Sequence, residues 1–246
     1  MTKVFYRTMR PYKNGYGEVT KYIEDPKYAQ QPKAYIRGLE TIQKDLLNIF
    51  DFIEPTEKNL KCYSFRIHEL FLRSCIEIEA NFKAILTENN YKTDLDKLNI
   101  NDYKKLAKTH NLPNYKVKIP YSHDKWSIRT PFANWPDGKL NWYRDYNSVK
   151  HSRVDQFKKS NLENLLDAVC GLLIILSAQF YTENFTRYGG KMRINGIPPG
   201  TMQLALGDYF LISFPSLDTW EKEDFYIEDQ ADNFEFTELD FTKIIK

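Results

Sequence analysis

Cysteine and histidine are scarce in this chain, which narrows the metal and disulfide chemistry open to it. Among 246 residues there are three cysteines and four histidines. Cys62, Cys75 and Cys170 are an odd set without the close spacing of a metal site, so we expect reduced, mostly buried thiols in a cytosolic protein. His68 does not begin the H-E-x-x-H pattern of a zinc protease, because position 72 is leucine. The sequence therefore predicts no metal site and no disulfide framework.

Motifs of several large enzyme classes are also missing. The ten glycines form no phosphate-binding loop, and the pair at 189–190 is better explained as the end of a helix. No serine or cysteine stands in the G-x-S-x-G setting of a nucleophile elbow. We therefore expect no bound cofactor and no nucleophile of this kind.

Long hydrophobic segments are absent as well. The first ten residues are polar and no apolar stretch follows them, so we expect no secretory signal. The most apolar run without a charged side chain covers residues 168–182, which is shorter than the ~20 residues needed to span a bilayer. We expect this run to form a buried helix in a cytoplasmic protein that does not enter the membrane.

Aromatic side chains, in contrast, are plentiful. The chain is 42% hydrophobic and 15% aromatic, with 17 tyrosines, 16 phenylalanines and four tryptophans. That composition can build a core, and the length suits one large domain or one domain with an appendage.

The net charge of +2 hides an uneven distribution. Residues 218–246 contain ten acidic residues and three lysines, a net −7, so residues 1–217 carry +9. A basic body is compatible with a polyanionic partner, although an ordinary soluble surface with an acidic end explains the charges equally simply. The acidic end could cover the basic body and inhibit it, or it could be a soluble edge or a partner contact.

Apolar residues recur at helical spacing over much of the chain. We expect helices over residues 33–53, 57–88, 102–110 and 138–152, and a helix of up to 28 residues from Ser160 to the glycine pair at 189–190. Asp102 is a good helix cap, and Pro55 ends the first of these segments.

The rest of the chain has no helical period. Residues 1–32 are expected to form an irregular arm, and residues 111–140, with four prolines, a long irregular insertion. Asn195-Gly196 predicts a hairpin, and residues 209–214 and 234–236 resemble strands. The predicted fold is mainly α: a helical domain over residues 33–189 with a small acidic β appendage over residues 190–246.

One octapeptide, Arg144-Asp-Tyr-Asn-Ser-Val-Lys-His151, carries most of the candidate chemistry. Seven residues make close to two helical turns, so Arg144 and His151 leave the helix on the same side. Trp142, Tyr146 and Val149 fall on the opposite side. The helix is therefore predicted to pack its aromatic side and to turn its Arg/His side away from the core.

This pair of side chains suits the cleavage of RNA by its own 2′-hydroxyl. Histidine has an unperturbed pKa near ~6.5 and can move protons, whereas arginine stays charged and stabilises a phosphorane. Asn147 could orient the substrate, and Lys150 and Arg153 could hold the strand by phosphate contacts. The bare spacing also occurs by chance, so the alternative is that Arg144 and His151 are two residues of a solvated face.

The segment from Trp142 to Arg153, followed by a long apolar helix, resembles the HEPN superfamily. These all-helical domains share an R-x4–6-H motif, often with Asn, Asp or His directly after the arginine, and here that residue is Asp145. The resemblance implies a helical bundle that dimerises with its two motifs facing each other. It also implies metal-independent endoribonuclease activity that leaves a 2′,3′-cyclic phosphate, as in toxins and abortive-infection factors.

The resemblance assigns roles to the motif. Arg144, His151 and Asn147 are the predicted catalytic residues, and the predicted substrate-binding residues are Asp145, Ser148, Lys150 and Arg153. Some toxin branches carry a modifiable tyrosine two residues after the histidine, but here Ser152-Arg153 follows. Regulation of that form is not expected, although an antitoxin or another regulatory partner protein remains a prediction.

Weaker signals lie outside the motif. Arg73 and Glu77 share a stripe on the 57–88 helix and are explained either as a surface salt-bridge ladder or as residues that order Arg144 or His151. Lysines and tyrosines alternate in two short segments and could bind RNA or form a solvated face. They are Lys104, Lys105, Lys108, Lys116 and Lys118, with Tyr103, Tyr115 and Tyr121. We expect Trp126, Phe132 and Trp135 in the core.

The sequence alone is compatible with three functions. The first is a homodimeric, metal-independent endoribonuclease that acts as a toxin or anti-phage effector. The second is a catalytically silent HEPN-like module that binds RNA or a partner protein. The third is an enzyme that acts on a small nucleotide through the same two residues.

Overall fold

A computed structural model describes residues 2–16, 20–91, 94, 97–120, 124–135, 138–185, 198–227 and 233–242. Within these residues the chain forms seven α-helices and two small β-sheets. The fold is therefore mainly α with β elements, as the sequence predicts.

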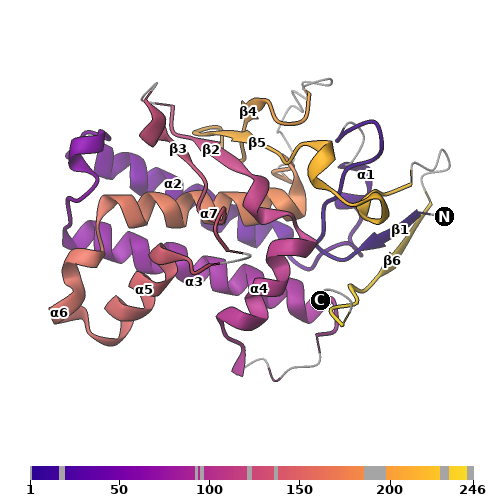
Figure 1. The fold of residues 1–246 in the computed structure, drawn as a ribbon, viewed down its shortest axis with the longest axis horizontal. Coiled ribbons are helices and arrows are strands. Elements are labelled where there is room, and N and C mark those ends of the chain that lie inside the picture. Colours follow the sequence, from indigo (N-terminus) through magenta and orange to yellow (C-terminus); the bar gives the residue numbers. More distant parts are fainter. Residues whose placement is uncertain are drawn as a thin grey trace.

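Four helices form a bundle that contains the main core: α2 (Pro32–Phe50), α3 (Phe65–Glu88), α5 (Asn141–His151) and α7 (Leu162–Phe180). The long helices α3 and α7 pack along each other, and both α2 and α5 contact this pair. Figure 1 shows the strands β2 to β5 on one side of α7 and the short helices α5 and α6 on the other, beside α3. The motif helix is thus an outer helix of the bundle.

In the central helix α7 every residue except Glu163 and Asp167 is buried, because other elements surround the helix. By length and composition it could cross a membrane, but 89% of its apolar window is buried in the fold, as in the core helix of a soluble protein. The helix begins after Asn161, whose side chain accepts a hydrogen bond from the backbone N–H of Asn164 at 3.0 Å. It ends at Tyr181, where φ becomes +56°. It is therefore shorter than expected, and the glycine pair proposed as its end lies outside the described residues.

The other helix boundaries also differ from the prediction in ways that caps explain. The 57–88 segment begins with a short 3₁₀ turn, Glu57–Asn59, and α3 starts only after Ser64, whose hydroxyl accepts from Ile67 N–H at 3.2 Å. Helix α4 (Ile100–Thr109) is capped by Asn99 and not by Asp102. Asp102 is the third residue of the helix, and its carboxylate accepts a hydrogen bond from the backbone N–H of Asn99, which completes a capping box.

The N-terminal residues are not an irregular arm. Strand β1 (Thr2–Phe5) pairs in parallel with β6 (Phe234–Thr237), and a short helix α1 (Thr20–Ile23) follows. Val4, Met9 and several tyrosines of this region are fully buried against the helices. Aromatic residues that look unpatterned in sequence therefore belong to the core.

The C-terminal residues are not a separate appendage either. In the four-stranded antiparallel sheet the order is β3-β2-β5-β4. Strands β2 (Lys116–Lys118) and β3 (Ile128–Arg129) come from the expected insertion, whereas β4 (Met202–Leu204) and β5 (Leu211–Ser213) come from the C-terminal segment. Two regions assigned to different units in the sequence thus share one sheet. The strand predicted over residues 209–214 is confirmed, and the hairpin at Asn195-Gly196 lies outside the described residues.

Candidate functional site

Helix α5 presents the motif as the sequence predicts. Trp142, Tyr143, Tyr146 and Val149 are buried, whereas Arg144, Lys150 and His151 are exposed. Burying this side of the helix against α3 and α7 fixes its rotation about its own axis, so the Arg/His stripe faces outward.

Two directed hydrogen bonds hold the buried side in place. The indole N–H of Trp142 donates to the carbonyl oxygen of Pro131 at 3.0 Å. The hydroxyl of Tyr143 donates to the Glu79 carboxylate on α3 at 2.7 Å. Burial, together with this bond, raises the pKa of Tyr143, so the phenol stays protonated as a donor. The position of Arg144 along α3 and α7 is therefore set by its two preceding residues.

The guanidinium of Arg144 is available to a ligand. Its side chain is 61% exposed, and its Nε lies 4.0 Å from the Asp145 carboxylate, at the limit of an ion pair. His151 is the last residue of α5, and among the described residues no hydrogen-bond partner contacts its ring. Both groups that the proposed chemistry needs are thus solvent-accessible and uncommitted.

Asp145, predicted to face the substrate, is turned toward the bundle. Its carboxylate accepts from the side-chain amide of Asn164 at 3.1 Å and lies 3.5 Å from the ammonium of Lys159. It therefore joins α5 to the first turn of α7. Ser148 is also occupied within the helix, because its hydroxyl donates to the carbonyl oxygen of Arg144 at 3.0 Å. Asn147 is half-buried beside them.

Two cationic side chains that are predicted to contact phosphates are exposed, and each lies over an aromatic ring. The Lys150 ammonium lies 5.3 Å from the Tyr146 ring centroid, and the Arg153 guanidinium lies 5.6 Å from that of Phe65. Neither cation is paired with a carboxylate among the described residues, so both charges are open to an anionic ligand.

Arg73 and Glu77 do not order the motif. Arg73 forms an ion pair with Asp45 of α2, and Glu77 lies against Gly38 of the same helix. Both residues are on the flank of α3 away from α5, so their predicted role behind Arg144 or His151 is wrong. Glu79, on the opposite flank of α3, contacts α5 instead, through the hydroxyl of Tyr143.

In the described part of the lysine–tyrosine segments, the tyrosines do not form a stacking surface. Tyr103 and Tyr115 are buried, which leaves no exposed face for a base, and Tyr121 lies outside the described residues. Lys105 is tied to Tyr91 and Asp102. Trp126, Phe132 and Trp135 are buried, as predicted.

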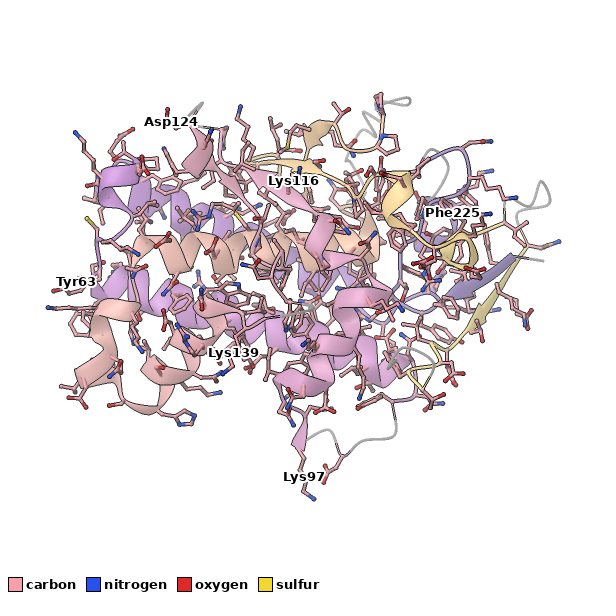
Figure 2. All side chains as sticks on the ribbon, viewed as in Figure 1. Tyr63, Lys97, Lys116, Asp124, Lys139 and Phe225 are labelled. Carbon is pink, nitrogen blue, oxygen red and sulfur yellow. The ribbon has the colours of Figure 1, made fainter. Side chains whose placement is uncertain are left out.

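Two hollows flank the bundle without including the motif pair. A groove of about 640 Å³ lies between the end of α2 and the start of α3. A more polar pocket of about 290 Å³ lies at the start of α5, next to Lys139, which Figure 2 labels. Arg144 and His151 line neither hollow, so in the single chain the motif is a surface stripe.

Comparisons with known proteins add no relative: no family model, no curated protein and no solved structure matches this chain.

Proposed function

We propose that this protein is a metal-independent endoribonuclease of the HEPN type, acting in the cytoplasm as a toxin or anti-phage effector. One observation carries the proposal: Arg144 and His151 are exposed on one side of a helix whose other side is buried and hydrogen-bonded. A rigid helix that holds a charged guanidinium and an open imidazole two turns apart provides both charge stabilisation and proton transfer.

The chemistry follows from these two groups. The 2′-hydroxyl attacks the adjacent phosphorus and loses its proton to an imidazole, while the bond to the 5′-oxygen breaks and that oxygen takes up a proton. Arg144 offers its fork to the non-bridging oxygens, whose charge increases in the transition state. The products are a 2′,3′-cyclic phosphate and a 5′-hydroxyl end.

A homodimer is part of the proposal. With the Arg144 side chain 61% exposed, water screens the charge that the reaction requires. A second copy placed against α5 would shield the stripe and bring two His151 rings to one cleft. One ring could then accept the 2′-hydroxyl proton while the other protonates the leaving oxygen.

A silent binding module is the second candidate, and the open surface around the motif favours it. Neither hollow beside the bundle is lined by Arg144 or His151, and Asp145 is committed to Asn164 and Lys159. Such a module would use the exposed cations of α5 to bind RNA or a partner protein without cutting.

RNA cleavage in EDTA separates the two candidates. We expect wild-type protein to cut single-stranded RNA and to leave cyclic phosphate ends, while Arg144→Ala and His151→Ala lose at least ~100-fold in rate. Arg37→Ala removes an exposed charge from α2 and is the matched control, expected to cut normally. Equal cleavage by wild type and His151→Ala would overturn the nuclease proposal, and RNA binding without cleavage by any of the proteins would support the silent module.

A further inference from the structure

Three aromatic rings lie together just beyond the end of the motif helix. The Phe157 ring centroid is 4.9 Å from that of Phe65 and 5.8 Å from that of Tyr63, which Phe157 meets edge-on. Phe65 is 61% exposed and Tyr63 is 45% exposed. Figure 2 labels Tyr63 at the end of the molecule where α3 begins. Tyr63, Phe65 and Phe157 are called the aromatic cluster below.

The backbone around the cluster is fixed rather than loose. Tyr63 forms a β-bridge with Asn161, and the N–H groups of Leu162 and Glu163 donate to carbonyl oxygens just before Tyr63, each at 2.9 Å. Beneath Phe157, the His68 ring lies 5.4 Å away and is hydrogen-bonded to Ser160 at 2.9 Å. The rings are therefore held in position before any ligand arrives, which lowers the entropy cost of binding.

The rim of the cluster is cationic. The Arg153 guanidinium lies over the Phe65 ring at 5.6 Å, and Lys158 directly follows Phe157 in the chain. Both are exposed, and neither has a carboxylate partner among the described residues. A single exposed ring needs no explanation, but two exposed rings that each pack on Phe157, beside unpaired cations, are the features of a single-stranded nucleic-acid site.

The cluster is continuous with the motif. Arg153 follows His151 by two residues, a length of chain that spans at most about 7 Å. The cationic rim also matches a phosphodiester backbone better than it matches the same rim on a second copy of the chain. A nucleotide on the rings would place the adjoining part of its strand beside His151.

We propose that the aromatic cluster is a stacking platform for an unpaired RNA base next to the bond that is cut. The base lies on the exposed rings of Phe65 and Tyr63, and its phosphates contact Arg153 and Lys158. The cleavage next to the bound base rests on the proposed ribonuclease function, whereas the binding of the base does not. It implies that the enzyme prefers single-stranded or looped RNA, because a paired base cannot reach the rings.

The test uses His151→Ala protein, which can bind RNA without cutting it, and a single-stranded RNA carrying 2-aminopurine. Stacking quenches the fluorescence of this base. Phe65→Leu keeps an apolar side chain but removes the ring, so we expect quenching to fall and Kd to rise about tenfold. Phe52→Leu is the matched control: Phe52 is 90% exposed at the end of α2, outside the cluster, and should bind normally. Arg153→Gln should weaken binding and reduce its salt dependence by about one charge.

The outcomes separate this inference from the nuclease proposal. Equal quenching and Kd for Phe65→Leu and Phe52→Leu would overturn the platform, even if the wild-type protein cuts RNA. Loss of quenching in Phe65→Leu alone would support it, even if no protein cuts. If Phe65→Leu instead changes the oligomeric state in light scattering and leaves RNA binding intact, the cluster is an interface between copies and the inference is wrong.

Discussion

His110 is a buried side chain whose charge state links stability to pH. Its ring donates from Nε2 to the carbonyl oxygen of Arg7 at 3.0 Å, and its Nδ1 lies 2.8 Å from the Thr109 hydroxyl. Burial lowers the pKa of His110 to about 4, and nearby Arg10 acts in the same direction, against the bond to Arg7. The ring is therefore neutral in the folded protein under conditions in which an exposed histidine becomes charged.

We expect the wild-type protein to lose stability as the pH falls from about 6.5 toward 4. In that range the unfolded chain binds a proton at His110 and the folded chain does not, so acid favours unfolding. The contribution is fully present above pH ~6.5 and decreases by about 2 kcal/mol by pH 5. Urea unfolding at pH 7.5 and pH 5 should show a smaller loss for His110→Gln than for wild type. Identical losses in the two proteins would contradict the assignment.

The directions of single side chains can be predicted from the sequence in some cases but not in others. The outward direction of Arg144 follows from the positions of Trp142 and Tyr146 in the same helix, so it could be predicted. The inward direction of Asp145 depends on Asn164, which is 19 residues further along and whose place is known only after the helices pack. A side chain between the two faces of a helix can turn either way, and its tertiary partner decides.

At the scale of elements, the sequence predicts that Glu77 and Glu79 lie on α3 but does not show which of them contacts α5. The two residues lie on opposite flanks of α3, and the sequence alone does not say which flank meets α2 and which meets α5. The structure assigns Glu77 to α2 and Glu79 to α5. The hydrophobic period therefore predicts which residues are buried more reliably than it predicts their neighbours.

The contact between α5 and α3 can be measured through Tyr143 and Glu79. Removing the hydroxyl in Tyr143→Phe leaves a partly buried carboxylate without its donor, and we expect a loss of about 1–2 kcal/mol in unfolding free energy. Glu79→Gln and the double variant complete a double-mutant cycle. A coupling energy of at least about 0.5 kcal/mol is expected, because the two groups are in contact. A coupling near zero would show that the bond does not hold α5 in place.

At the scale of the whole molecule, the sheets join segments that are far apart in the chain. Strands β2 and β3 have only three and two residues, too few for a period-two pattern to be recognised. The pairing of β2 with β5 links residues 95 positions apart, as in Val117 and Ile212, and β3 joins the sheet through β2. The helical part of the fold was predictable because each helix carries its own pattern, whereas these strands are defined by their partners.

The turn between β4 and β5 shows how this sheet is fixed to the helical bundle, and it allows a controlled test. Gly207 has φ +79°, and a Cβ there would lie 1.9 Å from Oε1 of Gln43, a fully buried residue of α2. The Gln43 amide donates to the carbonyl oxygen of Leu206 at 3.0 Å, so the turn is hydrogen-bonded to the helix. Gly207→Ala therefore adds both backbone strain and a displaced side chain.

Gly200→Ala supplies the matched control, because Gly200 has φ +83° but its Cβ would meet nothing closer than 3.9 Å. We expect Gly200→Ala to cost about 1 kcal/mol through strain alone, and Gly207→Ala to cost roughly 1–2 kcal/mol more in urea unfolding. Gln43→Ala should remove most of the extra cost when combined with Gly207→Ala, since the clash then disappears. Equal losses for the two glycine variants would mean that the sheet is not fixed to α2 at this turn. The extra loss, reversed by Gln43→Ala, would show that the β4–β5 turn, which follows the bundle in the chain, packs against α2 and helps to stabilise the bundle.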